Sequence, residues 1–350
     1  METLNIWEEM HMEEMAEKME ALLPEVHFSA ELLLEKLIRG DLYGAFYDIF
    51  EMLIDLLSLN LPALRKLMIG LLLIGIVSAF FIQFADLIEK YKVSEIGYYC
   101  VYLVVAVILV RCFRYYSAIA GAVLENILYF IKMMMPAYLL AISVATGTVT
   151  AAAEGQLLLL LIYGVEEVLR KGFLQVSTFF FIVSIIAGID LSDRWENLLD
   201  QLKKGIETGL KIAVGGVGGL SMLQAILTPA VDGLFGTTMQ RIISAIPGLG
   251  NSADSVLRIA AGSANVIKNS VGILLMLLLL VVCAMPILKI LAVALTLHVT
   301  SALLGIIGDQ KLSKTVMRAG QAGMLFLGVV FCAVLFFLLA FAATMASVRY

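Results

Sequence analysis

The chain has 350 residues, of which 61% are hydrophobic and 15% are charged, and its mean hydropathy is +0.97. Soluble domains carry about 25% charged residues, and here the apolar residues gather into windows of bilayer length. The composition excludes an ordinary soluble protein and predicts an all-α, polytopic membrane protein. The net charge of −5 supplies no basic surface for phosphates, so nucleic acid is not an expected partner.

The first 63 residues are predicted to form an N-terminal amphipathic helical region. Met1–Glu25 carries eight glutamates and one lysine. Phe28–Leu59 repeats apolar residues at three- and four-residue steps, with a break expected at Gly40-Asp41. This pattern favours two amphipathic helices that lie on the membrane surface or on the helix bundle. Met1–Pro24 lacks the apolar core of a signal peptide.

Residues 64–350 are predicted to form a multi-pass transmembrane domain. Four windows have about the 20 apolar residues that a bilayer requires, namely Leu64–Ala85, Ile96–Phe113, Phe173–Ile189 and Met324–Ala346. In the second window, Tyr98, Tyr99 and Tyr102 are expected to form an aromatic belt at the membrane interface.

The segment Tyr115–Ala153 is expected to be less regular, because Glu125, Asn126 and Lys132 interrupt it. Glu125 is the candidate intramembrane ionisable residue, and we expect it to face the interior of the bundle, since exposure to lipid costs several kcal/mol. After it, Gln156–Arg170 is predicted as a shorter apolar element that ends at an interface.

A Gly- and Ala-rich polar passage over residues 228–270 is expected to contain broken or re-entrant helices. Between Ser252 and Ser270, a helix at about 100° per residue gathers five polar side chains into one arc of roughly 100°. They are Asp254, Arg258, Asn265, Lys268 and Asn269. This polar arc is a candidate lining for a water-filled passage or a candidate face for a polar partner, and an ordinary surface helix at the headgroups is the alternative.

The apolar run Ser270–Gly308 is too long for one crossing, since a straight helix of that length would measure roughly 58 Å. Pro286 removes a backbone hydrogen bond and favours a bend, so we predict two helices that meet near Ala284–Lys289. Lys289, one turn after the proline, would suit an anion site. A lysine whose ammonium reaches the headgroups is the simpler interpretation.

No catalytic centre, metal site or cofactor is expected. The run Gly215–Gly219 lacks the lysine and strand of a phosphate-binding loop and is typical of helix packing. Ser221 and His298 lack the partners that a serine protease needs, and no HExxH motif is present. The four cysteines lie inside apolar runs without a Cys-x-x-Cys pair and are expected to be buried thiols.

Several short motifs occur in the order found in a known protein family. They are Leu67–Lys92 with Val93-Ser94, Met135-Pro136, Val231-Asp232-Gly233, Ile246-Pro247-x-x-Gly250, Asp254-Ser255, Lys268-Asn269-x-Val271-Gly272 and Ala284-x-Pro286-x-x-Lys289. In this shared order, over nearly the whole chain, the sequence resembles the stage III sporulation protein AE family of endospore-forming bacteria.

The resemblance implies a membrane subunit of the transenvelope channel, or feeding-tube, complex that links mother cell and forespore. It implies residence in the mother-cell-derived outer forespore membrane, contact with membrane lipid, and partners among the other stage III A proteins: small membrane subunits, ring-forming subunits and an ATPase. An ion-coupled secondary transporter or permease is the alternative, because isolated intramembrane ions and broken helices also build transport sites.

The resemblance also bears on topology. Family members commonly begin with a cleavable signal, which implies a segment before Met1 and an extracytoplasmic N-terminal region. The predicted loop Asp309–Arg318 is basic, so the positive-inside rule places it in the cytoplasm and Tyr350 outside. With both ends outside, the number of crossings is expected to be even, six or eight.

Overall fold

The structure is a computed structural model that describes residues 36, 41–87, 91–146, 163–189, 193–215, 279–280, 283–307 and 310–347. Within these ranges every residue except Asp41 is helical. Five helices are long and apolar enough to cross a membrane: Ser58–Phe80, Ile96–Tyr129, Tyr163–Ile189, Cys283–Ile307 and Gln310–Leu338. The chain is an all-α, multi-pass membrane protein, as its composition predicts. The even number of crossings concerns the whole chain and stays a prediction.

The first long helix, α4 (Leu42–Leu87), begins directly after the break that the sequence predicts. Asp41 caps it, because its Oδ1 accepts a hydrogen bond from the Gly44 N–H at 2.9 Å. The helix continues through Pro62. The predicted division between residues 63 and 64 therefore falls inside one helix, whose 46 residues measure about 69 Å.

The second long helix, α5 (Tyr91–Thr146), joins two elements that the sequence analysis separates. The prediction of an interrupted segment after Phe113 is wrong, because Thr146 still belongs to the same helix. Glu125 does not break the helix because its side chain is exposed, whereas Tyr116, Leu124 and Ile127 keep one continuous buried face. With 56 residues, α5 measures about 84 Å, more than twice the hydrocarbon thickness of a bilayer.

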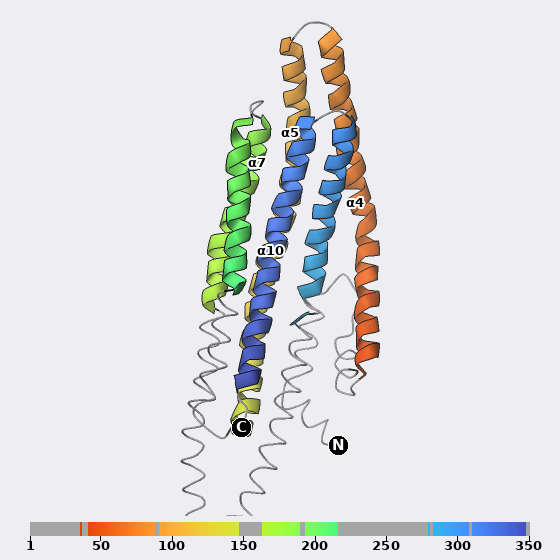
Figure 1. Cartoon of the computed structure of the whole chain (residues 1–350). Helices are drawn as coiled ribbons and strands as arrows, with labels where there is room; N and C mark the ends of the chain where they lie inside the picture. The colour runs from red at the N-terminus through yellow and green to blue at the C-terminus, as the bar shows by residue number, and fades with distance from the viewer. Residues whose placement is uncertain are drawn as a thin grey trace, which may run out of the picture.

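The third span, Tyr163–Ile189, is also continuous, although the sequence predicts an element ending at Arg170 and a new one from Phe173. The two parts are joined by a π-helical turn, η1 (Leu169–Phe173), in which the Leu174 N–H donates to the Leu169 carbonyl. The helix then continues as α7 (Leu174–Ile189). After the short 3-10 turn η2 (Asp193–Trp195), the chain runs back as a helix over residues 196–215 (Figure 1).

The last two spans form an antiparallel pair, Cys283–Ile307 and α10 (Gln310–Ser347). Ser301 and Ser313 bind each other reciprocally: each hydroxyl donates to the other residue's carbonyl, at 2.9 and 2.8 Å. The predicted basic loop Asp309–Arg318 is therefore wrong from Gln310 onward. Its basic side chains stand on the first turns of α10, where the serine pair holds the helices together.

The helix α10 is the centre of the bundle and packs against both α7 and α5, while α4 packs on α5 (Figure 1). The Phe113 ring stacks on Phe181 with centroids 4.3 Å apart and meets the edge of Phe326. Glycines make the close approach possible: a methyl group on Gly323 would lie 2.6 Å from the Tyr116 ring. Small residues let membrane helices approach in this way.

Two of the three tyrosines expected at the membrane interface lie inside the bundle. Tyr98 and Tyr102 are 5% and 1% exposed. Their hydroxyls donate to the Gly188 and Ile185 carbonyls of α7, at 3.0 and 2.5 Å. The predicted belt is wrong for this pair, because the carbonyls at the end of α7 offer acceptors inside the bundle.

Candidate functional site

Lys289 and Pro286 both lie in the helix Cys283–Ile307. Pro286 is the fourth residue of that range. The structure describes residues 279–280 and 283–307 as helical but not the two residues between them. The junction predicted near Ala284–Lys289 therefore stays a prediction.

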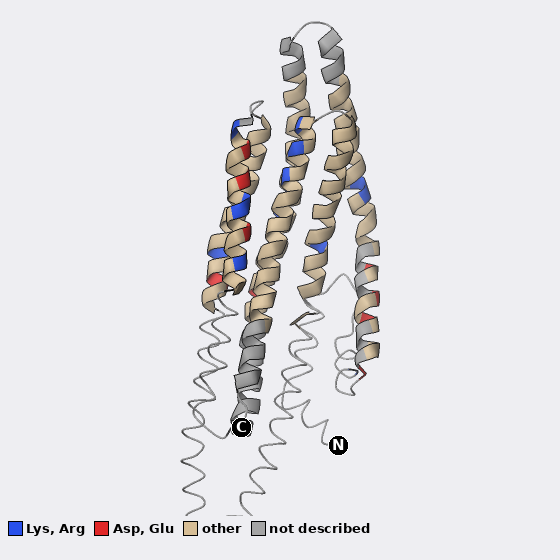
Figure 2. Ribbon diagram, in the orientation of Figure 1, with Lys and Arg blue, Asp and Glu red and all other residues tan. Residues whose placement is uncertain are grey.

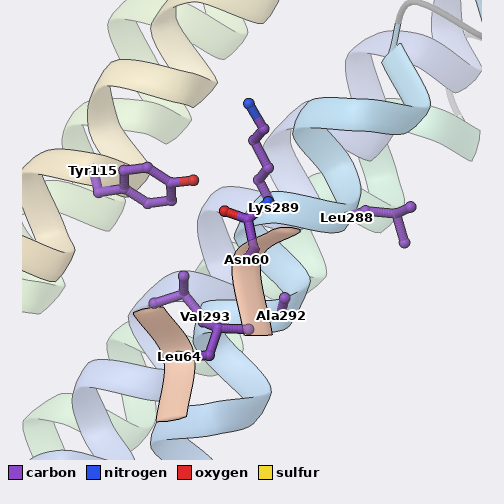
Figure 3. A pocket seen from close by; sticks show the side chains of 7 residues that line it. All are labelled: Asn60, Leu64, Tyr115, Leu288, Lys289, Ala292 and Val293. Carbon is purple, nitrogen blue, oxygen red and sulfur yellow. The ribbon is translucent and has the colours of Figure 1, made fainter. Parts of the chain in front are cut away.

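Lys289 lines a pocket between three helices, which we call the Lys289 pocket (Figure 3). The space in it that the centre of a water-sized sphere can reach is about 10 Å³, which is room for about one water molecule. Its lining residues are Asn60 and Leu64 of α4, Tyr115 of α5, and Leu288, Lys289, Ala292 and Val293. The polar groups gather at one end, where the Tyr115 hydroxyl points toward Asn60 and Lys289. Leu64, Ala292 and Val293 lie at the other end.

Glu125 does not face the interior of the bundle, so that prediction is wrong. Its side chain is 69% exposed, and its Oε1 lies 3.8 Å from Nη1 of Arg170, which is 45% exposed. The pair joins the surface of α5 to η1. Because Arg170 partners the carboxylate at the surface, the carboxylate does not have to be buried. Exposed pairs of this kind contribute roughly 0–1 kcal/mol in water.

A second group of charges joins the start of the helix over residues 196–215 to α10. The Lys314 ammonium donates to Glu196 Oε1 at 2.6 Å, and Arg318 Nη2 lies 3.6 Å from the same oxygen. The Arg318 side chain is only 12% exposed. Sequence analysis missed this group, because Glu196 and Lys314 are 118 positions apart and no local pattern connects them.

The helix over residues 196–215 carries charges along one face, seen as alternating red and blue segments (Figure 2). The face consists of Asp200, Lys204, Glu207 and Lys211, which we call the charged stripe. At 100° per residue they fall within an arc of about 60°. Asp200, Lys204 and Lys211 are exposed, and Glu207 is half-exposed and lies 3.9 Å from Lys203.

The charged stripe runs alongside two candidate spans. At one end of its helix, Glu196 binds Lys314 of α10. Near the other end, a methyl group on Gly209 would lie 2.7 Å from the Phe173 ring, and the Leu210 side chain lies against Gly328 of α10. The opposite side of the helix, with Leu199, Ile206 and Leu210, is buried. The stripe is thus held on the outside of the bundle, beside helices that are apolar enough to cross a membrane.

The five residues of the predicted polar arc, Asp254, Arg258, Asn265, Lys268 and Asn269, lie outside the described residues, and so does Ser221. His298 is half-buried, and a methyl group on Gly320 of α10 would lie 3.2 Å from its ring. Within the described ranges, no three His, Cys, Asp or Glu side chains are grouped so that they could hold a metal ion.

The chain is similar to known proteins over most of its length. Residues 28–348 match the family model described as stage III sporulation protein AE. The stage III sporulation protein AE of Bacillus subtilis (strain 168) is 23% identical over 288 residues, which cover 82% of this chain and 71% of that protein. No solved structure matches the chain significantly. Since the family model covers far more than half of the sequence, the chain belongs to the stage III sporulation protein AE family.

Proposed function

We propose that this chain is a membrane subunit of the transenvelope channel complex that links mother cell and forespore during sporulation. In this proposal it lies in the outer forespore membrane, catalyses no reaction, and assembles with the other stage III A proteins. Membership of a sporulation family and five candidate spans support the general role. The charged stripe is the observation that carries the proposal from a sporulation membrane protein to a subunit of an assembly.

If the charged stripe faced lipid, its charges would raise the free energy of the inserted protein. A charged side chain at the centre of a bilayer costs about 3 kcal/mol on insertion scales. For the three exposed charges, Asp200, Lys204 and Lys211, the total would be comparable with the net stability of a typical domain, about 5–15 kcal/mol. A stripe held beside α7 and α10 is therefore expected to meet water or another protein rather than acyl chains.

The sequence of charges along the stripe favours a protein partner. The order is negative, positive, negative, positive over 12 residues, which a partner with alternating charges can match and a uniformly charged ligand cannot. Complementary charges fix the register between partners more than they add affinity. A membrane subunit of the same complex that presents a mixed-charge helix fits this requirement.

The test is capture of partners by full-length tagged protein from sporulating cells. We expect Lys204→Leu and Lys211→Leu, each of which removes one positive charge from the stripe, to insert at normal abundance, fail to capture the other stage III A proteins, and block spore formation. The matched control is Lys66→Leu, which removes an exposed lysine from α4. Normal capture and normal sporulation by both stripe variants would contradict the proposal.

A secondary transporter is the second candidate, and the Lys289 pocket is the observation that favours it, because a cation between spans is typical of anion transport sites. The purified chain in proteoliposomes distinguishes the two functions. A transporter alone would show substrate-dependent uptake that Lys289→Met abolishes. The channel-subunit proposal expects no uptake by the isolated chain.

A further inference from the structure

The first turns of α4 expose a line of aromatic and aliphatic side chains, which we call the apolar seam. It consists of Tyr43, Tyr47, Phe50 and Ile54, each of which is between 50% and 85% exposed. Their spacing of four, three and four residues is the heptad spacing with which one helix packs along another. At 100° per residue they fall within an arc of about 60°. Contiguous exposed apolar surface of this kind marks sites of interaction with proteins or membranes.

A bilayer that α4 crosses does not cover the apolar seam. The candidate span of α4 begins at Ser58, after the seam, and the helix continues through Pro62 in one piece. Tyr43 lies 15 residues before Ser58, which is about 22 Å along the helix axis. In Figure 1 these first turns, in red, reach beyond the start of the helix Cys283–Ile307. The seam therefore leaves the membrane along the direction of the span and does not lie flat on its surface.

Acidic side chains flank the apolar seam on one side. Glu51 and Asp55 are exposed and lie about 70° and 110° around the helix from the centre of the seam. Asp48 follows at about 130°, and its carboxylate accepts a hydrogen bond from the Lys36 ammonium at 2.5 Å. Figure 2 shows acids in red along this part of α4. Acyl chains are a poor cover for these turns, because carboxylates are costly inside a bilayer.

The side of α4 that faces the bundle is a different one. Ile49 packs against the buried core, and Asn60 lines the Lys289 pocket. These two residues lie about 110–130° around the helix from the centre of the seam, in the direction away from the acids. Going around α4, the bundle contact comes first, then the apolar seam, then the acids. A partner can therefore reach the seam and the acids together without displacing a described helix.

The charges decide which partner fits. Two copies of the chain in one membrane share an orientation, so their α4 helices would pack in parallel at the same height. Between residues 40 and 64 the sequence has no Lys or Arg, so a second α4 would bring no base to Glu51 and Asp55. The chain's own Met1–Glu25, with eight glutamates, would add like charge. A helix of another protein can supply both an apolar face and the missing bases.

We propose that the apolar seam binds a helix of a different protein, whose apolar face is flanked on one side by Lys or Arg. The apolar face packs on Tyr47 and Phe50 with anchors at three- and four-residue steps. The bases pair with Glu51 and Asp55, and such flanking charges set the choice and orientation of the partner helix. This surface is separate from the charged stripe, which lies on the helix over residues 196–215, and it does not rest on the channel proposal.

The test is photo-crosslinking with the full-length protein in sporulating cells. Tyr47→p-benzoylphenylalanine keeps an aromatic ring in the seam and, on illumination, bonds covalently to a C–H group within reach. The adducts are identified by mass spectrometry. We expect a peptide of another protein in which apolar residues recur at three- and four-residue steps beside Lys or Arg. The control is Ile69→p-benzoylphenylalanine, an exposed position inside the candidate span, which should give lipid adducts.

Charge reversal tests the role of the acids. In the Tyr47→p-benzoylphenylalanine protein, Glu51→Lys together with Asp55→Lys should reduce the adduct by about ten-fold or more, because like charges across an interface are unfavourable. The neutral pair Glu51→Gln and Asp55→Asn should reduce it a few-fold, and it carries the test if the reversed variant is not abundant. The control is Glu125→Lys, which reverses an exposed carboxylate on α5 and should leave the adduct unchanged.

The outcomes that overturn the proposal are distinct. They are an adduct with lipid alone, with a second copy of the chain, with a protein segment that lacks the basic and apolar pattern, or with nothing. An undiminished adduct in the charge-reversed and neutral variants at normal abundance also overturns it. The result does not require the captured protein to be a stage III A protein, so failure of the channel proposal and failure of this one are distinguishable.

Discussion

The contact between α5, α7 and α10 around Gly188 gives a prediction that can be worked out in energy. A methyl group on Gly188 would lie 2.5 Å from the Tyr102 hydroxyl and 2.6 Å from Oγ1 of Thr315. Both neighbours are 1% exposed, so neither can move into solvent. Adding a methyl group to a packed core costs about 1–3 kcal/mol. Displacing Tyr102 from the Ile185 carbonyl leaves buried polar groups unpaired, at about 1–3 kcal/mol more.

Gly188→Ala is therefore expected to destabilise the folded chain by about 2–6 kcal/mol. At about 2–4 °C per kcal/mol, its apparent unfolding temperature in detergent should fall by roughly 4–24 °C. The control is Gly121→Ala in α5, where the new methyl group meets no heavy atom within 4 Å and alanine favours the helix. If Gly188→Ala unfolds at the temperature of Gly121→Ala, the packing of α5 on α7 described above is incorrect.

Three further predictions follow from other parts of the chain. Lys314→Met should change the free energy of unfolding by less than about 1 kcal/mol, because Arg318 still pairs with Glu196. Thermal unfolding at low and at high salt measures this change. A large shift of the unfolding temperature at both salt concentrations would contradict the prediction. Cys100 is exposed, whereas Cys112, Cys283 and Cys332 are buried, so a maleimide should modify Cys100 first. If peptide mapping finds that one of the three buried cysteines is labelled faster than Cys100, the described helix packing is incorrect. From the sequence alone, Asn265→Leu should leave the abundance of the protein nearly unchanged yet block sporulation. A normal count of heat-resistant spores would show that the polar arc is only a solvated helix face.

The sequence predicts where the chain crosses the membrane better than where its helices end. Apolar length identifies Leu64–Ala85 and Met324–Ala346, which lie largely within the observed helices, because the cost of exposing backbone to lipid makes a long apolar run helical. It does not show that α5 continues past Phe113. A polar residue such as Glu125 stops an apolar run in the sequence, but a helix tolerates it when its side chain points outward.

The candidate site depends on contacts between distant segments, and these contacts have no local signal. Pro286 and Lys289 are conspicuous in the sequence, yet the pocket also needs Asn60 and Tyr115, which are separated from Lys289 by more than 170 positions. The charged stripe is different, because its spacing of four, three and four residues is visible in the sequence.

Protection of the charged stripe by partner proteins would show whether the stripe is an interface. Lys204→Cys, in a chain with Cys100→Ser, is labelled with a water-soluble maleimide in membranes from sporulating cells that contain or lack the other stage III A proteins. We predict rapid labelling of Lys204→Cys without those proteins and strong protection with them, while Lys66→Cys is labelled equally in both. Equal labelling of Lys204→Cys in both membranes would show that no partner covers the stripe, and no labelling in either would show that it faces lipid; each result would contradict the proposed role.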